Sequence, residues 1–215
     1  MLIKICGITS PDTAIACFEA GADMIGLVYY PPSPRHIDET KINEILDATT
    51  PFRQKMGRAI LVAVDHLPSE NVTNRVDGIQ IYREIQADEH KRYRFPSLMV
   101  RGVRDSATFS RFLETPVKHE HDRRFLLELS EGILPGGNGA SWDWSRAKPF
   151  CERHTTLLAG GITPENAVDA IRQAGPYGID VSSGVESAPG IKDMEKVRRL
   201  IENVRNYQPQ QEPIE

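Results

Sequence analysis

Two side chains have the types that acid–base catalysis uses and stand where apolar runs end. Cys6 closes the run Leu2–Cys6, and Glu128 follows Phe125-Leu126-Leu127. A thiolate can remove a proton, and a carboxyl group at the end of a buried strand is costly unless it faces a polar cavity or is paired. We therefore interpret Glu128 as a functional acid and Cys6 as a base or nucleophile if its pKa is lowered. The alternative for Cys6 is a small buried hydrophobe.

Two glycine-containing turns near the carboxyl end of the chain have the composition of a phosphate site. Gly160-Gly161 is one, and Ser182-Ser183-Gly184 is the other. Glycine lets backbone N–H groups approach an anion closely. Gly136-Gly137-Asn138-Gly139 is a third candidate, which could close over a ligand or help to hold the same phosphate. Each of the three can also be an ordinary turn or loop.

Three further residues stand at places where a ligand could be recognised. Arg35 follows Pro31-Pro32-Ser33-Pro34, a stiff loop that can hold its guanidinium toward a carboxylate or a phosphate. Asp180 and Tyr82 each end or follow a predicted strand. For Arg35 the alternative is an ordinary surface arginine.

The elements that must position these residues follow a repeated strand-then-helix rhythm. Amphipathic stretches separate the strands, and Ser10-Pro11 and Thr163-Pro164 each offer a helix cap followed by proline. The predicted helices are Pro11–Ala20, Glu39–Ala48, Ser106–Glu114, Pro164–Ala174 and Lys192–Val204. The eight predicted strands are Leu2–Cys6, Met24–Val28, Ala59–Val64, Gly78–Ile81, Leu98–Arg101, Phe125–Glu128, Thr156–Ala159 and Gly178–Val181.

This rhythm predicts an α/β fold. Eight units in 215 residues favour a closed (β/α)₈ TIM barrel over an open doubly wound sheet, which commonly has fewer strands. We expect a single barrel domain over 1–206 and a flexible polar tail over 207–215. In such barrels active groups lie at the carboxyl ends of the strands, and the loops after strands 7 and 8 often bind phosphate. The candidate residues would then gather at one end of the barrel.

Composition excludes several other classes. The formal charge is −4, and no basic stretch is interleaved with aromatics, so a nucleic-acid partner is not expected. The longest apolar runs, such as Ile60–Val64, are far too short to cross a membrane, and no secretory signal is visible, so we expect a cytoplasmic chain. Cys6, Cys17 and Cys151 are too few and too widely spaced for a disulfide framework or a zinc site.

The same residues carry a resemblance that runs from residue 3 to about residue 205 and is weak only over 66–124. The chain resembles the phosphoribosylanthranilate isomerases of tryptophan biosynthesis. The matching segments are Lys4-Ile5-Cys6-Gly7-Ile8-Thr9, Gly21-Ala22-Asp23-Met24-Ile25-Gly26, Ser33-Pro34-Arg35, Gly136-Gly137-Asn138-Gly139, Trp142-Asp143-Trp144, Leu158-Ala159-Gly160-Gly161-Ile162-Thr163-Pro164-Glu165-Asn166, Gly178-Ile179-Asp180-Val181-Ser182-Ser183-Gly184-Val185-Glu186 and Pro189-Gly190-Ile191-Lys192-Asp193.

The resemblance implies a TIM barrel that rearranges N-(5-phosphoribosyl)anthranilate without metal or organic cofactor. It implies that Cys6 is the general base at C2′ and that Glu128 protonates the ring oxygen. It also implies that Arg35 pairs with the anthranilate carboxylate and that Asp180 supports the reaction, with Tyr82 among the substrate-binding positions. Phosphate binding falls to the turns after strands 6, 7 and 8, through Gly139, Gly160, Gly161, Ser183 and Gly184.

Three segments depart from the family pattern. Glu128 replaces an aspartate and is one methylene longer, and Tyr82-Arg83 replace a histidine and a glycine at the end of strand 4. Asn138 replaces a threonine, which is a milder change because asparagine also suits tight turns.

The alternative to an active isomerase is a phosphosugar-binding barrel without this turnover, or one acting on another amino-sugar phosphate. Whether the chain is a monomer or a homodimer stays open.

Overall fold

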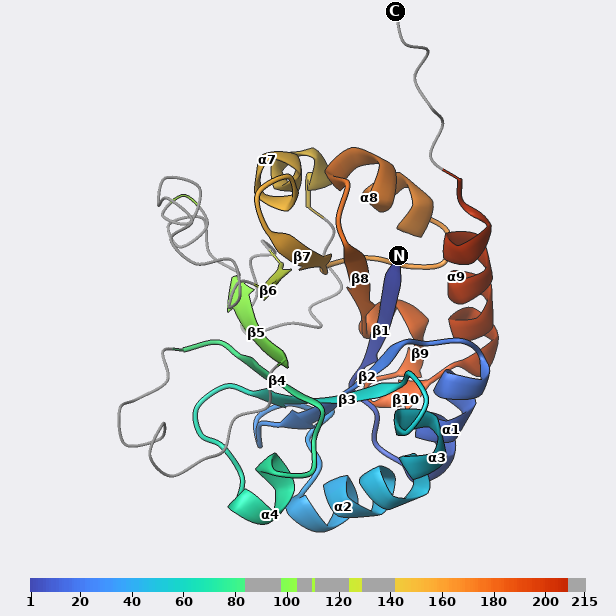
Figure 1. The fold of residues 1–215 in the computed structure, drawn as a ribbon. Coiled ribbons are helices and arrows are strands. Elements are labelled where there is room, and N and C mark those ends of the chain that lie inside the picture. Colours follow the sequence, from blue (N-terminus) through green and yellow to red (C-terminus); the bar gives the residue numbers. More distant parts are fainter. Residues whose placement is uncertain (84–97, 104–109, 111–123, 129–141, 209–215) are drawn as a thin grey trace, which may run out of the picture.

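Eight parallel strands close into a barrel, as predicted. The computed structural model describes residues 1–83, 98–103, 110, 124–128 and 142–208. Neighbours in the barrel follow chain order, and β8 pairs with β1 to close the ring (Figure 1). The strands are β1 Leu2–Cys6, β2 Met24–Tyr29, β3 Arg58–Ala63, β4 Gly78–Ile81, β5 Leu98–Val103, β6 Arg124–Leu127, β7 Thr155–Leu158 and β8 Gly178–Val181.

Helices lie around the outside of the strands, and α1, α2, α8 and α9 form much of that layer (Figure 1). No helix in the described ranges is both long enough and apolar enough to span a membrane. The helical elements are α1 Pro11–Glu19, α2 Glu39–Ala48, α3 Thr50–Arg53, α4 Glu70–Thr73, η2 Trp144–Ala147, α7 Lys148–Cys151, α8 Ala167–Ala174, η3 Ser183–Val185 and α9 Met194–Asn206, and a small antiparallel pair, β9 Glu186–Ala188 and β10 Ile191–Lys192, follows β8.

The strands alternate between two environments because successive side chains of a strand point to opposite faces. Ile3 and Ile5 of β1 belong to the main core between the barrel and the helices. Leu2, Lys4 and Cys6 belong by the same alternation to the barrel interior, where Leu2 packs with Met24, Ile60 and Leu157. The interior is therefore apolar at the amino ends of the strands and becomes polar toward their carboxyl ends.

Helix starts were predicted with mixed success. Ser10 caps α1 and accepts a hydrogen bond from the Thr13 N–H, as expected. Thr163 Oγ1 accepts a hydrogen bond from the Glu165 N–H at 3.3 Å, but the predicted helix start at Pro164 is wrong. Asn166 accepts from the Thr163 N–H at 2.7 Å in a turn that delays α8 until Ala167.

The predicted start of the last helix at Lys192 is also wrong. Lys192 belongs to β10, and Asp193 caps α9 by accepting from two backbone N–H groups, those of Glu195 and Lys196. The predicted helix Ser106–Glu114 lies outside the described residues except at position 110. The predicted tail lies outside them from residue 209 to residue 215.

Candidate active site

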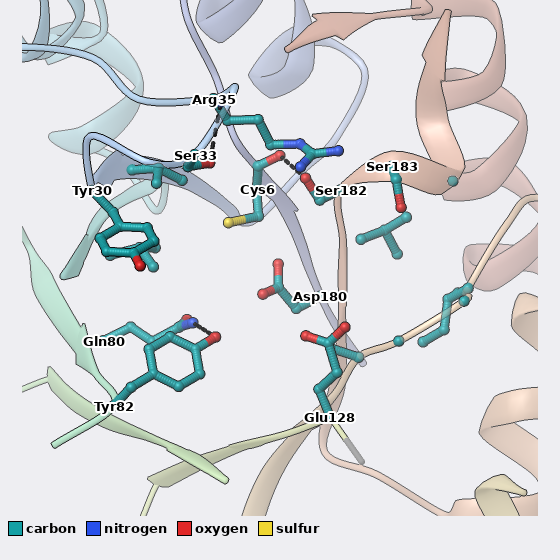
Figure 2. Close-up of a pocket in the computed structure, with 18 of the residues that line it drawn as sticks. Cys6, Tyr30, Ser33, Arg35, Gln80, Tyr82, Glu128, Asp180, Ser182 and Ser183 are labelled. Atoms are coloured by element: carbon teal, nitrogen blue, oxygen red, sulfur yellow. Dashed lines mark hydrogen bonds between the residues drawn. The ribbon is translucent and has the colours of Figure 1, made fainter. Parts of the chain in front are cut away.

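A pocket opens at the carboxyl ends of the barrel strands. It encloses about 710 Å³ of empty space, part of it open to solvent. The side chains of Cys6, Asp180 and Glu128 converge on it (Figure 2). The other predicted residues that line the pocket are Arg35, Tyr82, Gly160, Gly161, Ser183 and Gly184. Gly139 lies outside the described residues.

Cys6 occupies the inner rim of the pocket because β2 leaves room for it. Cys6 is paired in register with Gly26, and a Cβ at position 26 would lie 2.6 Å from the Cys6 Sγ. Only glycine fits there without displacing the thiol. Cys6 is 8% exposed, so the sulfur is shielded from bulk water but remains on the pocket wall.

Burial raises the pKa of the Cys6 thiol above its ordinary value, so the lowered pKa that would make Cys6 a ready base is not found here. The positive charges of Lys4 and Lys192 act in the opposite direction and favour the thiolate, whereas the negative charge of Asp180 adds to the effect of burial. Desolvation is the largest of these effects because a small thiolate loses much hydration on burial. The thiol is therefore mostly protonated in the empty pocket.

Glu128 is buried directly after β6, with 5% of its surface exposed. Its side chain packs against the β7 turn, where a Cβ at position 160 would lie 3.1 Å from the Glu128 Cγ. Trp142 supports the same turn by donating a hydrogen bond from its indole to the Ala159 carbonyl at 2.9 Å. The carboxyl group is thus held between two neighbouring strand ends and faces the pocket, as the sequence predicted.

A hydrogen-bonded chain crosses the barrel at the floor of the pocket. The Lys4 ammonium donates to Asp180 Oδ2 and to Gln80 Oε1, both at 2.8 Å. The Gln80 amide in turn donates to the Tyr82 hydroxyl at 2.8 Å. Asp180 Oδ1 is buried and has no hydrogen-bond partner among the described residues, so one lone pair of a pocket carboxylate is left for a ligand.

Tyr82 stands on the pocket wall at the position where the strand-4 motif departs from the family pattern. Burial raises its pKa well above the ordinary value, and Glu128, Cys6 and Asp180 add to that shift when they are ionised. The phenol therefore stays neutral and can donate its proton in a hydrogen bond. Its ring packs beside Val28 and Val62.

Arg35 is held by a carboxylate of the protein itself. Its Nε and Nη2 donate to the two oxygens of Glu186 at 2.8 and 2.7 Å, and both side chains are almost fully buried. Lys192 donates to the same carboxylate at 2.7 Å. Although burial alone would raise the pKa of Glu186, these two cations outweigh it and lower that pKa. The stiff loop predicted for Arg35 thus works together with a clamp that the sequence did not reveal.

The turns after β7 and β8 meet at the pocket. Gly160 and Gly161 have φ values of +93° and +68°, which side chains rarely adopt. A Cβ at Gly184 would lie 1.9 Å from the Ile162 carbonyl oxygen, so glycine is what allows the two turns to touch. Ser183 opens the short helix η3 beside them. The predicted glycine turns are therefore adjacent in space.

The two sides of the pocket differ in character. Tyr30 and Tyr82 pack on the apolar cluster around Val28 and Val62, and they lie across the pocket from Ser182 and Ser183 (Figure 2). An aromatic group fits the first side and an anionic group fits the second. A molecule that joins an aromatic ring to a phosphate would span both.

Sequence reasoning did not single out Lys4, Gln80, Glu186 and Lys192, although all four are buried around the site. Lys4 and Gln80 carried a usable signal, because each is a polar residue on the inward-facing register of an apolar strand. Glu186 and Lys192 lie in segments that match the family, but nothing local indicated that they pair, since they meet only through the pairing of β9 with β10.

Comparisons with known proteins agree with this geometry over nearly the whole chain. The family model for N-(5′-phosphoribosyl)anthranilate isomerase matches residues 3–203. The chain belongs to this family. A relative named N-(5′-phosphoribosyl)anthranilate isomerase, from Desulfatibacillum aliphaticivorans, is 37% identical over 212 residues and is covered to 96%, as is this chain.

Solved structures of phosphoribosylanthranilate isomerases share the fold. The enzyme from Thermotoga maritima superposes with a TM-score of 0.77 at 29% identity, covering 96% of this chain and all of that one. A second isomerase structure, in complex with reduced 1-(o-carboxyphenylamino)-1-deoxyribulose 5-phosphate, has a TM-score of 0.74 at 28% identity, with 96% and 100% coverage. That ligand has an aromatic ring at one end and a phosphate at the other.

Proposed function

We propose that this protein converts N-(5-phosphoribosyl)anthranilate into 1-(2-carboxyphenylamino)-1-deoxyribulose 5-phosphate, with Glu128 as general acid and Cys6 as general base. The observation that carries the proposal is the convergence of a thiol and a carboxyl group on one pocket with an aromatic side and a glycine-lined side. Membership of the isomerase family supports the same reaction.

The first step opens the ribose ring. Glu128 gives its proton to the ring oxygen, the bond from that oxygen to C1′ breaks, and the anthranilate nitrogen supplies the electron pair that forms a C=N bond. A carboxyl group that stands directly after β6 and lines the pocket is placed to act as this acid.

The second step moves a proton from carbon to sulfur. The Cys6 thiolate takes the C2′ proton, the C–H electron pair forms a C1′=C2′ bond, and the C=N electrons return to nitrogen. The enol-amine so formed becomes the aminoketone product by a further proton shift. Asp180 supports this step by accepting a hydrogen bond from the substrate through its open Oδ1.

Binding would be divided between the two sides of the pocket. The backbone N–H groups of Gly160, Gly161, Ser183 and Gly184 hold the phosphate, together with Gly139 from outside the described residues. The anthranilate ring lies against Tyr82, and its carboxylate faces the Arg35 guanidinium edge that Glu186 leaves open. Arg35 is buried and fixed, so it can orient a carboxylate without a conformational cost.

The deciding experiment follows the loss of anthranilate fluorescence when purified protein is mixed with freshly generated phosphoribosylanthranilate. We expect turnover in the unchanged chain. Cys6→Ser should lose about 10²- to 10⁴-fold in kcat with little change in KM, because the thiol acts on the barrier and not on ground-state binding. Cys151→Ser is the matched control, since Cys151 lies in α7 and not in the pocket.

Two results would contradict the proposal. Near-normal kcat in Cys6→Ser would remove Cys6 as the base. Absence of turnover, with the reduced product analogue still bound, would identify a phosphosugar-binding relative. Tyr82 and Arg83 would then be the first residues to replace with the histidine and glycine of the family.

Glu128→Asp should keep or raise activity, because aspartate is the family residue at that position.

A further inference from the structure

Lys4 is the most deeply buried cation of the described chain, and the reaction outlined above leaves it without a role. It is fully excluded from solvent inside the barrel, two residues before Cys6 on β1. Because strand side chains alternate, Lys4 and Cys6 point into the same interior, with Lys4 one layer below the thiol. A lysine at such a depth is costly unless its charge is paired and used.

The surroundings of Lys4 fix both its position and its charge. Its ammonium donates to Asp180 Oδ2 and Gln80 Oε1, each at 2.8 Å, and β1 and β8 are in register at Lys4 and Asp180. Burial by itself would lower the pKa of Lys4, but the attraction of Asp180, together with that of Cys6 when it is a thiolate, outweighs burial and raises the pKa. Lys4 therefore remains an ammonium ion.

Several charged or titratable groups surround the Cys6 thiol, one from its own strand and the others from other elements. These are Lys4 on β1, Asp180 on β8, Lys192 on β10, Arg35 after β2, Tyr82 after β4 and Glu128 after β6. Among the cations, Arg35 and Lys192 are both bound to Glu186. Burial is the largest effect on the pKa of both lysines. The pKa of Lys192 is lowered as a result, whereas the pKa of Lys4 is raised because its partners outweigh burial.

We propose that Lys4 is a positioning residue that stabilises the Cys6 thiolate from beneath and neutralises Asp180, so that a buried thiol can act as the base. Asp180 opposes the thiolate by its own negative charge, and the ion pair with Lys4 cancels that effect while keeping the Asp180 carboxylate aimed at the pocket. This inference rests on the role proposed for Cys6, but its test needs no substrate.

The test measures the ionisation of Cys6 in the substrate-free protein. The rate of alkylation by iodoacetamide and the ultraviolet absorbance of the thiolate are followed against pH, and the signal of Cys6→Ser is subtracted to remove Cys17 and Cys151. We expect Lys4→Met to raise the pKa of Cys6 by about one unit or more, which slows alkylation about tenfold at a fixed pH below that pKa. Lys4→Arg should restore most of the loss.

Asp180→Asn should shift the pKa of Cys6 in the opposite direction to Lys4→Met. Removing the aspartate charge should lower the pKa of Cys6 and speed alkylation, whereas a purely structural disturbance of the barrel would shift both variants in the same direction. Lys41→Met, which removes a surface lysine of α2, is the control and should leave the titration unchanged. Equal titration in Lys4→Met and the unchanged chain, or equal signs for Lys4→Met and Asp180→Asn, would overturn the proposal.

Lys4→Met leaves Asp180 unpaired and can prevent folding. In that case the double variant Lys4→Met/Asp180→Asn, which removes both charges together, is compared with Asp180→Asn alone. The pKa of Cys6 must rise from the single to the double variant. If the pKa of Cys6 shifts as expected in the variants but the unchanged chain shows no turnover, only the isomerase proposal is contradicted. If the unchanged chain turns over but the pKa of Cys6 does not shift in the Lys4 variants, only the role of Lys4 is contradicted.

Discussion

Glu186 binds Arg35 through both carboxylate oxygens: the Arg35 Nε donates a hydrogen bond to Oε1 at 2.8 Å, and Nη2 donates to Oε2 at 2.7 Å. Two buried groups from distant parts of the chain thereby fix one guanidinium plane at the edge of the pocket. Lys192 shares the carboxylate, so Glu186 balances two cations. This arrangement makes Glu186 as important as Arg35 for the orientation of the site.

Glu186→Gln should lower the free energy of unfolding by about 3–5 kcal/mol, because removing one partner of a buried ion pair leaves uncompensated charge. It should also raise KM more than it lowers kcat, since Arg35 loses its orientation. Denaturant unfolding and steady-state kinetics measure the two effects. Glu44→Gln, in the exposed pair Lys41–Glu44, is the control and should cost no more than about 0.5 kcal/mol. An equal loss of unfolding free energy in Glu186→Gln and Glu44→Gln would contradict the stabilising role of the Glu186 ion pairs.

Gly26→Ala should impair catalysis more than folding. The new Cβ would lie 2.6 Å from the Cys6 Sγ and 3.0 Å from its Cα, so the thiol must move. A displacement of about 1 Å costs on the order of a hundredfold in rate. Gly175→Ala is the comparison, because its φ of +60° strains any side chain but no atom lies within 4 Å of the added carbon. That variant should lose stability and keep its kcat.

Gly184→Ala should weaken phosphate binding. Its Cβ would collide with the Ile162 carbonyl and separate the turns after β7 and β8. We expect KM, and the inhibition constant of inorganic phosphate, to rise about 10- to 100-fold, since a hydrogen bond to a charged group contributes about 1.5–3 kcal/mol. An unchanged inhibition constant would place the phosphate elsewhere.

Stability should fall at alkaline pH partly through Cys17. Burial raises the pKa of Cys17 from 9.0 to about 12, so the unfolded chain loses the thiol proton while the folded chain retains it. Unfolding is then favoured as pH rises from the unfolded value toward the folded value, by about 1.4 kcal/mol for each pH unit. Cys17→Ala should show a shallower decline over that range in denaturant titrations. Parallel curves for the two proteins would refute this contribution.

Much of the barrel could be predicted from the sequence because it depends on local patterns. Strands such as Leu2–Cys6 and Gly78–Ile81 were predicted with their observed bounds, since short apolar runs between turn residues indicate buried strands. Helix starts were less certain. At Asn166 a side-chain hydrogen bond to the Thr163 N–H competes with the helix, and composition alone does not reveal that competition.

The sequence by itself determined which residues stand at strand ends, and so it pointed to Cys6, Glu128 and the glycine turns. Only the tertiary structure decided the environment of those groups. Burial sets the direction of the Cys6 pKa shift, and Lys4, Asp180 and Glu186 acquire their partners from strands and loops far away in the chain. The physical reason is that strand periodicity is a local property, whereas desolvation and charge pairing arise only when distant segments pack together.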